Sequence, residues 1–155
     1  MPREALESAL HPIFNVLKGE DIADRALVSR LSAAFPWDGD VISAIRIAAR
    51  DGVAEGWLCN RENGGIKFSR PVKPSPATNE FAVDAVVMDR VDGPKHTHPN
   101  GEVNLCFTED GDPRFCGNAE GFVVFPPGST HVPSVTGGRM LILYFLPAGA
   151  IQFHA

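Results

Sequence analysis

The stretch GPKHTHPNGEVNLCF, residues 93–107, carries the strongest structural signal in the chain. It places His96 and His98 two residues apart and Glu102 four residues later. Side chains two apart in a strand point to the same side, so the two histidines share a face if they lie in a strand. A tight turn at 99–101 would return Glu102 to that face. The stretch is therefore either a polar turn between two strands or three ligands of one metal ion.

A second stretch, PPGSTH at residues 126–131, supplies a fourth candidate ligand. Its Pro-Pro-Gly turn is followed by His131, which a sheet closed into a barrel would bring to the first three residues. Two imidazoles and one carboxylate with open coordination positions suit a divalent first-row metal, and open positions are what a catalytic site requires. We favour metal binding, because three of the five histidines of the chain lie in this pattern. The plainer alternative is that these side chains only hydrogen-bond inside a small barrel.

The composition indicates one domain rich in turns. The chain has 155 residues, with fifteen glycines and thirteen prolines, which favours many short strands. A net charge of −5 argues against general nucleic-acid binding, which favours a basic face. Three scattered cysteines are too few for a disulfide framework, and their odd number fits a reducing compartment. With no signal peptide and no apolar run of the roughly 20 residues that span a bilayer, we expect a cytoplasmic protein without a membrane partner.

Hydrophobic periodicity divides this single domain, 1–155, into a helical segment, 1–52, and a β segment, 53–155. The predicted helices cover residues 4–17, 21–35 and 40–50. Pro12 should kink or restart the first helix, and Asp21 and Asp40 are expected to cap the second and third. Asp51 and Gly52 should end the third helix. Beyond it, GWLCN (56–60) and GGIKFSRPV are expected to be strands joined by the turn RENGG (61–65), and further short strands suggest a β-sandwich or small barrel.

The motifs HTHPNGE and PPGSTH resemble the two motifs of the cupin superfamily, HxHx3E and PxGx2H. The resemblance implies a mainly β fold, a cupin-type β-barrel (double-stranded β-helix or jelly roll), with an N-terminal bundle of about three α-helices. It also implies a divalent metal, Fe, Mn, Zn or Ni, on four ligands. These ligands are His96, His98, Glu102 and His131. The chain departs from the second motif at Val135, where the motif has asparagine.

A closer resemblance, to the 4-hydroxylaminobenzoate lyase family, covers residues 5–154. It rests on GGIKFSRPVKPSPAT, GPKHTHPNGEVN, the long C-terminal stretch from GFVVFPPGSTH to IQFH, and the helical N-terminus. It implies conversion of 4-hydroxylaminobenzoate to 3,4-dihydroxybenzoate and ammonia in nitroaromatic degradation, with Glu102, His98 and His131 as catalytic residues. Cupin-type barrels often pair, so a homodimer is expected. No nucleotide cofactor is expected, because the chain has neither a GxGxxG motif after a strand nor a Walker loop.

A substrate carboxylate requires a cation, and Arg70 and Lys73 in SRPVKP are the candidates. Arginine is the better partner for a planar carboxylate, although both residues are equally explained as solvated surface charges. Asn104 has the same strand parity as Glu102 and is a candidate substrate contact. Tyr144 lies in an apolar strand and is expected to pack in the core.

Two other functions are compatible with the same motifs. An iron-dependent cupin dioxygenase of a small aromatic or thiol substrate would use the same four ligands and would consume oxygen. A non-catalytic cupin that binds a small acid would bind its ligand without turnover.

Overall fold

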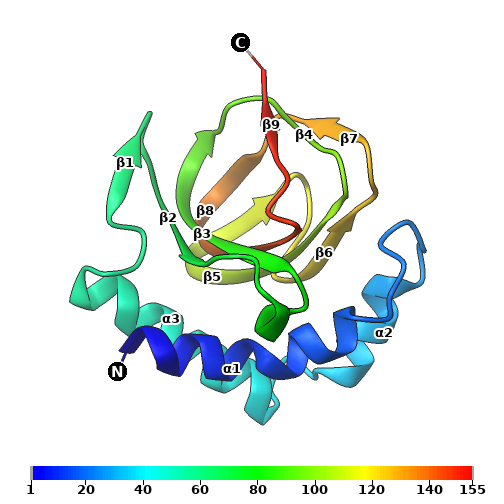
Figure 1. Ribbon diagram of the computed structural model, residues 1–155. Helices are drawn as coiled ribbons and strands as arrows, with labels where there is room; N and C mark the ends of the chain where they lie inside the picture. Colours follow the sequence, from blue (N-terminus) through cyan, green and yellow to red (C-terminus); the bar gives the residue numbers. More distant parts are fainter. Residues whose placement is uncertain (1, 155) are drawn as a thin grey trace.

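The computed structural model describes residues 2–154 as two antiparallel sheets with helices on one side (Figure 1). The helices are α1 (Pro2–Leu17), α2 (Leu27–Ala34), α3 (Asp40–Glu55) and a short 3-10 helix, η1 (Pro76–Thr78). The strands are β1 (Arg61–Asn63), β2 (Ile66–Val72), β3 (Phe81–Asp92), β4 (His96–His98), β5 (Glu102–Phe115), β6 (Gly121–Phe125), β7 (Ser129–His131), β8 (Ser134–Pro147) and β9 (Gln152–Phe153).

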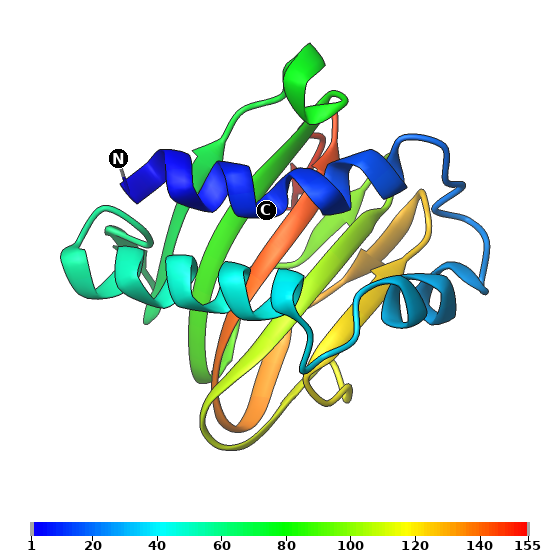
Figure 2. The ribbon, with the colours of Figure 1, turned by 90° about the horizontal axis from the view of Figure 1, so that it is seen from below.

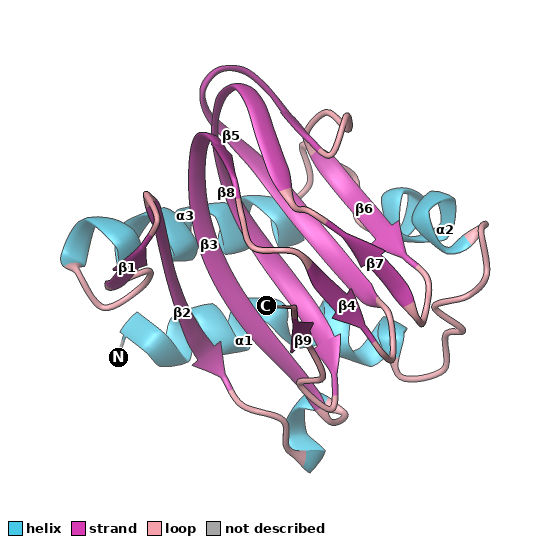
Figure 3. Ribbon diagram, turned by 90° about the horizontal axis from the view of Figure 1, so that it is seen from above, coloured by secondary structure: helices cyan, strands magenta, loops and turns pink. Residues whose placement is uncertain are grey.

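The larger sheet has the strand order β1-β2-β3-β8-β5-β6, and the smaller one has the order β7-β4-β9 (Figure 3). The two sheets enclose an interior, and α1 and α3 cross the outer face of the larger sheet (Figures 1 and 2). The predicted cupin-type β-barrel with an N-terminal helical bundle is therefore confirmed.

Strand β8 shows how one strand serves both faces of the larger sheet. Leu141, Leu143 and Phe145 pack in the cluster that includes the helices, whereas Ile142 and Tyr144 pack in a second cluster inside the barrel. Successive side chains of a strand point to opposite faces, so a strand covered on both sides is apolar at nearly every position. The stretch MLILYFL, residues 140–146, is apolar without interruption for this reason.

Helix α1 continues through Pro12, so of the two predicted outcomes the helix does not begin again at this position. A proline inside a helix costs about 3 kcal/mol. The buried face of α1 offsets that cost, because Leu6, Leu10 and Ile13 are fully buried and each such side chain contributes roughly 1.5–3 kcal/mol.

The predicted start of the second helix and end of the third helix are wrong. Asp21 caps a turn instead of a helix: its side chain accepts a hydrogen bond from the Ala23 amide at 2.9 Å, and α2 begins only at Leu27. Helix α3 has Gly39 rather than Asp40 at its N-cap, and it continues to Glu55, past the expected boundary at residue 52.

Gly52 has a packing role rather than a terminating one. A Cβ at this position would lie 2.6 Å from the Trp57 ring, so the indole requires a glycine on the helix surface. Gly56 ends α3 with a φ of 85°, the left-handed conformation that favours glycine.

The first predicted strand is wrong as well. Residues 57–59 form bends, and β1 occupies Arg61–Asn63 inside the predicted turn. The Cys59 amide donates a hydrogen bond to the Ser69 hydroxyl at 2.9 Å and fixes the chain before β1. The hairpin is therefore tighter than expected, with Gly64 and Gly65 between its strands.

Candidate metal centre and substrate cavity

The four predicted ligands come from three neighbouring strand ends. His96 and His98 are the first and last residues of β4, and Glu102 is the first residue of β5. The turn between them is closed by the Gly101 amide, which donates to the His98 carbonyl at 3.1 Å. His131 on β7 is the direct partner of His96 in the small sheet. The predicted tight turn at 99–101 is confirmed, and it returns Glu102 to the face of the histidines.

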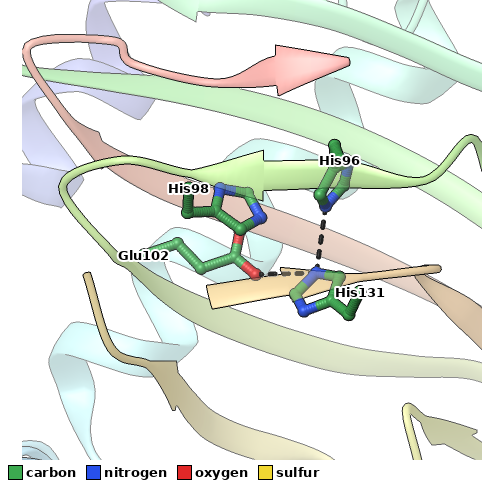
Figure 4. Close-up of side chains that lie close together, drawn as sticks. All are labelled: His96, His98, Glu102 and His131. Atoms are coloured by element: carbon green, nitrogen blue, oxygen red, sulfur yellow. Dashed lines mark hydrogen bonds and ion pairs between the residues drawn. The ribbon is translucent and has the colours of Figure 1, made fainter. Parts of the chain in front are cut away.

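These side chains converge on one point inside the barrel (Figure 4). Candidate ligand atoms of all four residues lie within 4.8 Å of one another. The Nε2 atoms of His96 and His131 are 2.9 Å apart, and the Glu102 carboxylate lies 3.0 Å from His98 Nε2 and 3.5 Å from His131 Nε2. Two ligand atoms that are each about 2.1 Å from a metal are separated by roughly 3.0–3.4 Å at usual coordination angles. The three separations given above are close to this spacing.

The donor atoms have few other partners. His98 and Glu102 are fully buried, and His98 Nε2 and both Glu102 oxygens form no hydrogen bond with any described residue. The 3.0 Å contact between them is close but is not oriented as a hydrogen bond. Leaving buried polar atoms unpaired costs about 1–3 kcal/mol each. A divalent metal would satisfy all of these atoms, so the residues present fit a metal ion.

His96 and His131 are in the protonation state that a metal requires. Burial, helped by the nearby imidazoles of His98 and His131, lowers the pKa of His96 to about 3. Burial also lowers the pKa of His131, although the Glu102 carboxylate opposes this effect. Both rings are neutral at neutral pH and keep a lone pair for coordination.

A cavity of about 590 Å³ opens beside His96 and runs along the inner face of β2 and β3. Phe68, Val86 and Met88 form apolar walls, and Phe153 of β9 lies at its rim, where its ring contacts that of His96 at 5.8 Å. Ligand sites commonly have volumes of roughly 300–1,000 Å³ and mostly apolar walls. The cavity is large enough for a single substituted aromatic ring beside the four-residue cluster.

The predicted substrate contacts fall in different places. Arg70 lines the cavity, but Lys73 is exposed and is not part of its lining. Asn104 is fully buried next to Tyr144 in the sheet register, and neither atom of its amide has a hydrogen-bond partner among the described residues. The structure thus places Arg70 in the cavity wall and Asn104 among the buried residues of β5, and it leaves Lys73 outside the cavity.

Among the lining residues that were not predicted as site residues, Tyr144 and Arg61 are the two that we use below. Tyr144 was expected only to pack in the core. Its position on the inner face was readable from the alternation with Leu143 and Phe145, but nothing in an apolar stretch indicates which face holds a site. Arg61 gave no signal, because it lies in the segment predicted to be a turn.

Comparison with known proteins decides the family. The sequence profile of the 4-hydroxylaminobenzoate lyase family matches residues 9–153. This chain belongs to the 4-hydroxylaminobenzoate lyase family. A 4-hydroxylaminobenzoate lyase from Nocardioides sp. (strain LMS-CY) is 32% identical, over 98% of this chain and 94% of its own length. One from Pseudomonas putida is 34% identical, over 88% of each chain. The chain is accordingly an enzyme of the lyase type.

A solved structure supports the fold alone. The DMSP lyase from Ruegeria pomeroyi DSS-3 superposes with a TM-score of 0.51 at 14% identity, covering 97% of this chain and 96% of that one. Within residues 2–154, no helix has the length and apolar character needed to cross a bilayer.

Proposed function

We propose that this lyase converts 4-hydroxylaminobenzoate and one water molecule to 3,4-dihydroxybenzoate and ammonia. In the overall change, the N–O bond breaks, a hydroxyl group forms on the neighbouring ring carbon, and hydrolysis of the resulting imine releases ammonia. The reaction involves no net oxidation, so it needs no redox cofactor. The cluster of His96, His98, Glu102 and His131 beside a cavity of aromatic-ring size carries the proposal, in a chain of this family.

His96, His98, Glu102 and His131 would hold a divalent metal. A metal there would polarise the N–OH oxygen and lower the pKa of a bound water. His98 and His131 are catalytic in this proposal through that metal. Glu102 is the carboxylate of the cluster, and we assign the removal of the ring proton to whichever of its oxygens does not bind the metal.

Tyr144 is the proton donor that we assign to the leaving hydroxyl group. Its side chain lines the cavity together with His96. Burial raises the pKa of Tyr144 well above its usual value, an effect to which the Glu102 carboxylate adds. The phenol therefore keeps its proton at neutral pH and can donate it where charge develops on the departing oxygen.

The partnerless amide of Asn104 is the group that we assign to hydrogen bonding with the substrate. It lies on the strand of Glu102, two residues further along and on the same face. Of the two predicted cations, Arg70 remains a candidate for the cavity, and the exposed Lys73 is the weaker one.

Incubation of purified protein with 4-hydroxylaminobenzoate under anaerobic conditions tests this function. Equimolar ammonia and 3,4-dihydroxybenzoate are expected, and metal analysis of the same sample identifies the ion. Turnover that requires oxygen would support the dioxygenase alternative instead. Binding of the substrate without turnover in a metal-loaded sample would contradict the lyase.

We also propose that the enzyme is a cytoplasmic homodimer, as is common for cupin-type barrels acting on small dissolved substrates. Light scattering coupled to gel filtration should give twice the mass of the chain. A monomeric mass would contradict the dimer, and recovery with the membrane or extracellular fraction would contradict the location.

A further inference from the structure

Two arginines line the cavity, but one of them is already neutralised. Arg70 Nε lies 2.6 Å from Asp84 Oδ1, and its Nη2 donates to Asp84 Oδ2 and to the Gly149 carbonyl, each at 3.2 Å. Arg70 Nε and Nη2, which could otherwise bind a substrate carboxylate, are therefore already used for hydrogen bonds within the protein. Because Asp84 lines the same cavity, an incoming carboxylate would meet a pair with no net charge.

Arg61 is the other arginine, and its position follows from the β1–β2 hairpin. It is the direct antiparallel partner of Phe68, so both side chains lie on the same face, and both line the cavity. The Arg61 guanidinium lies over the Phe68 ring, 5.6 Å from its centroid. This cation–π contact holds the guanidinium against the ring, and such a contact leaves the N–H groups at the guanidinium edge available for hydrogen bonds.

Among residues 2–154, no carboxylate forms an ion pair with Arg61. Since the charges of Arg70 and Asp84 cancel, Arg61 gives the cavity wall its net positive charge. Strand β1 stands at one edge of the large sheet and β4 lies in the opposite small sheet (Figure 3). The cavity therefore has a cation on one strand and the four-residue cluster on another.

We propose that Arg61 binds the carboxylate of the aromatic substrate and thereby selects para-substituted benzoates. In such a ring the carboxylate and the reacting nitrogen are at opposite ends, which matches a cavity whose walls include both Arg61 and His96. The inference rests on the proposed function for the identity of the reacting group, but the carboxylate-binding step does not depend on turnover. Arg61 thereby replaces Arg70 and Lys73 as the residue that we expect to determine the preference for a negatively charged substrate.

The hairpin offers a matched control for this assignment. Lys67 is paired with Glu62 and lies one residue from Phe68, so its side chain points to the other face of the hairpin. Neither Lys67 nor Glu62 lines the cavity. Lys67→Gln removes one positive charge from the same hairpin without changing the cavity wall.

Calorimetric titration with benzoate and with benzamide, its uncharged counterpart, tests carboxylate binding without chemistry. The wild type is expected to bind benzoate at least about tenfold more tightly than benzamide, since hydrogen bonds to charged groups contribute that much or more. Arg61→Gln should remove this preference, and Arg61→Lys should keep part of it, whereas Lys67→Gln should keep all of it. A preference for benzoate that survives Arg61→Gln would overturn the proposal, as would a wild type that binds both ligands equally.

Kinetics on 4-hydroxylaminobenzoate separate this inference from the proposed function. Arg61→Gln should raise KM roughly 10- to 100-fold with a smaller change in kcat, because the lost contact is far from the reacting nitrogen. Unchanged KM in an active enzyme overturns the role of Arg61 and leaves the lyase function standing. If benzoate binding depends on Arg61 but the protein shows no turnover, the role of Arg61 stands and the lyase function is overturned. Circular dichroism of each variant establishes that the hairpin substitution leaves the fold intact.

Discussion

The two faces of the large sheet are built from alternate residues of the same strands, yet they bury different chemistry. On the outer face, Leu143 and Phe145 of β8 meet the helices in an apolar cluster. On the inner face, Tyr144 lies beside Asn104 and near Glu102, and the last two have polar atoms without hydrogen-bond partners. Unpaired buried polar atoms cost stability, whereas buried apolar side chains supply it. Both faces therefore stabilise the fold through buried apolar side chains, and the inner face in addition carries the partnerless polar groups to which we assign binding and catalysis.

The largest expected effect is on the four-residue cluster. His98→Ala or His131→Ala should abolish turnover and release the metal, since even changes around a metal ligand lower affinity or activity by about 10- to 100-fold. The far-ultraviolet spectrum should be unchanged, because the helices and the outer face are untouched. His11→Ala, an exposed histidine on α1, is the matched control. Full activity in both cluster variants would show that the site is elsewhere.

A pair of neighbouring residues on β8 tests the two faces directly. Tyr144→Phe should lower kcat roughly 100-fold, because it removes a general acid, while the free energy of unfolding changes by less than about 1 kcal/mol. Phe145→Ala should lower the free energy of unfolding by about 3–5 kcal/mol and Tm by roughly 6–20 °C. Steady-state kinetics and thermal unfolding measure both. If Tyr144→Phe loses stability instead of activity, the inner face is a structural core.

These contrasts also explain how far the sequence could be interpreted. The spacing of His96, His98 and Glu102 predicted the cluster, because strand alternation and a three-residue turn leave little freedom. The helix ends could not be predicted from Asp21 or Gly52, since a local turn and the packing of Trp57 decide them. Such contacts form between elements and leave no periodic signal.

The substrate cavity was the least predictable part. Arg61 reaches it only because the β1–β2 hairpin is tighter than GWLCN and RENGG suggested, which sets Arg61 opposite Phe68. Arg70 is the better carboxylate partner by residue type, but its ion pair with Asp84 already neutralises it. The sequence shows that a cation is present, but it does not show which carboxylate forms an ion pair with it in the folded protein.

A smaller effect of opposite sign is expected at Asn104. Asn104→Leu has nearly the same shape and removes a partnerless buried amide, so it should raise the free energy of unfolding by about 1 kcal/mol. It should also lower kcat/KM, because the amide is assigned to the substrate. Asn118 is the matched control: its amide donates to the carbonyls of Phe115 and Cys116 at 3.1 and 3.2 Å, so Asn118→Leu should destabilise. A loss of stability in Asn104→Leu as large as in Asn118→Leu would contradict this assignment.

The last prediction is that probes on the two sides of the large sheet report the same unfolding midpoint. We propose that the helices and the barrel form one cooperative domain, because residues of α1 and α3 share a core cluster with the outer face of the sheet. The chain offers a probe for each side. Trp37 and Trp57 belong to the helical side, where they pack against its cluster, and Tyr144, the single tyrosine, lies inside the barrel. Tryptophan fluorescence and the ¹⁹F resonance of incorporated fluorotyrosine should therefore report the same denaturant midpoint. Two separate midpoints would mean that the helical segment and the barrel unfold as distinct units. The inner face of the sheet would then keep its geometry without the packing of the helices on the outer face.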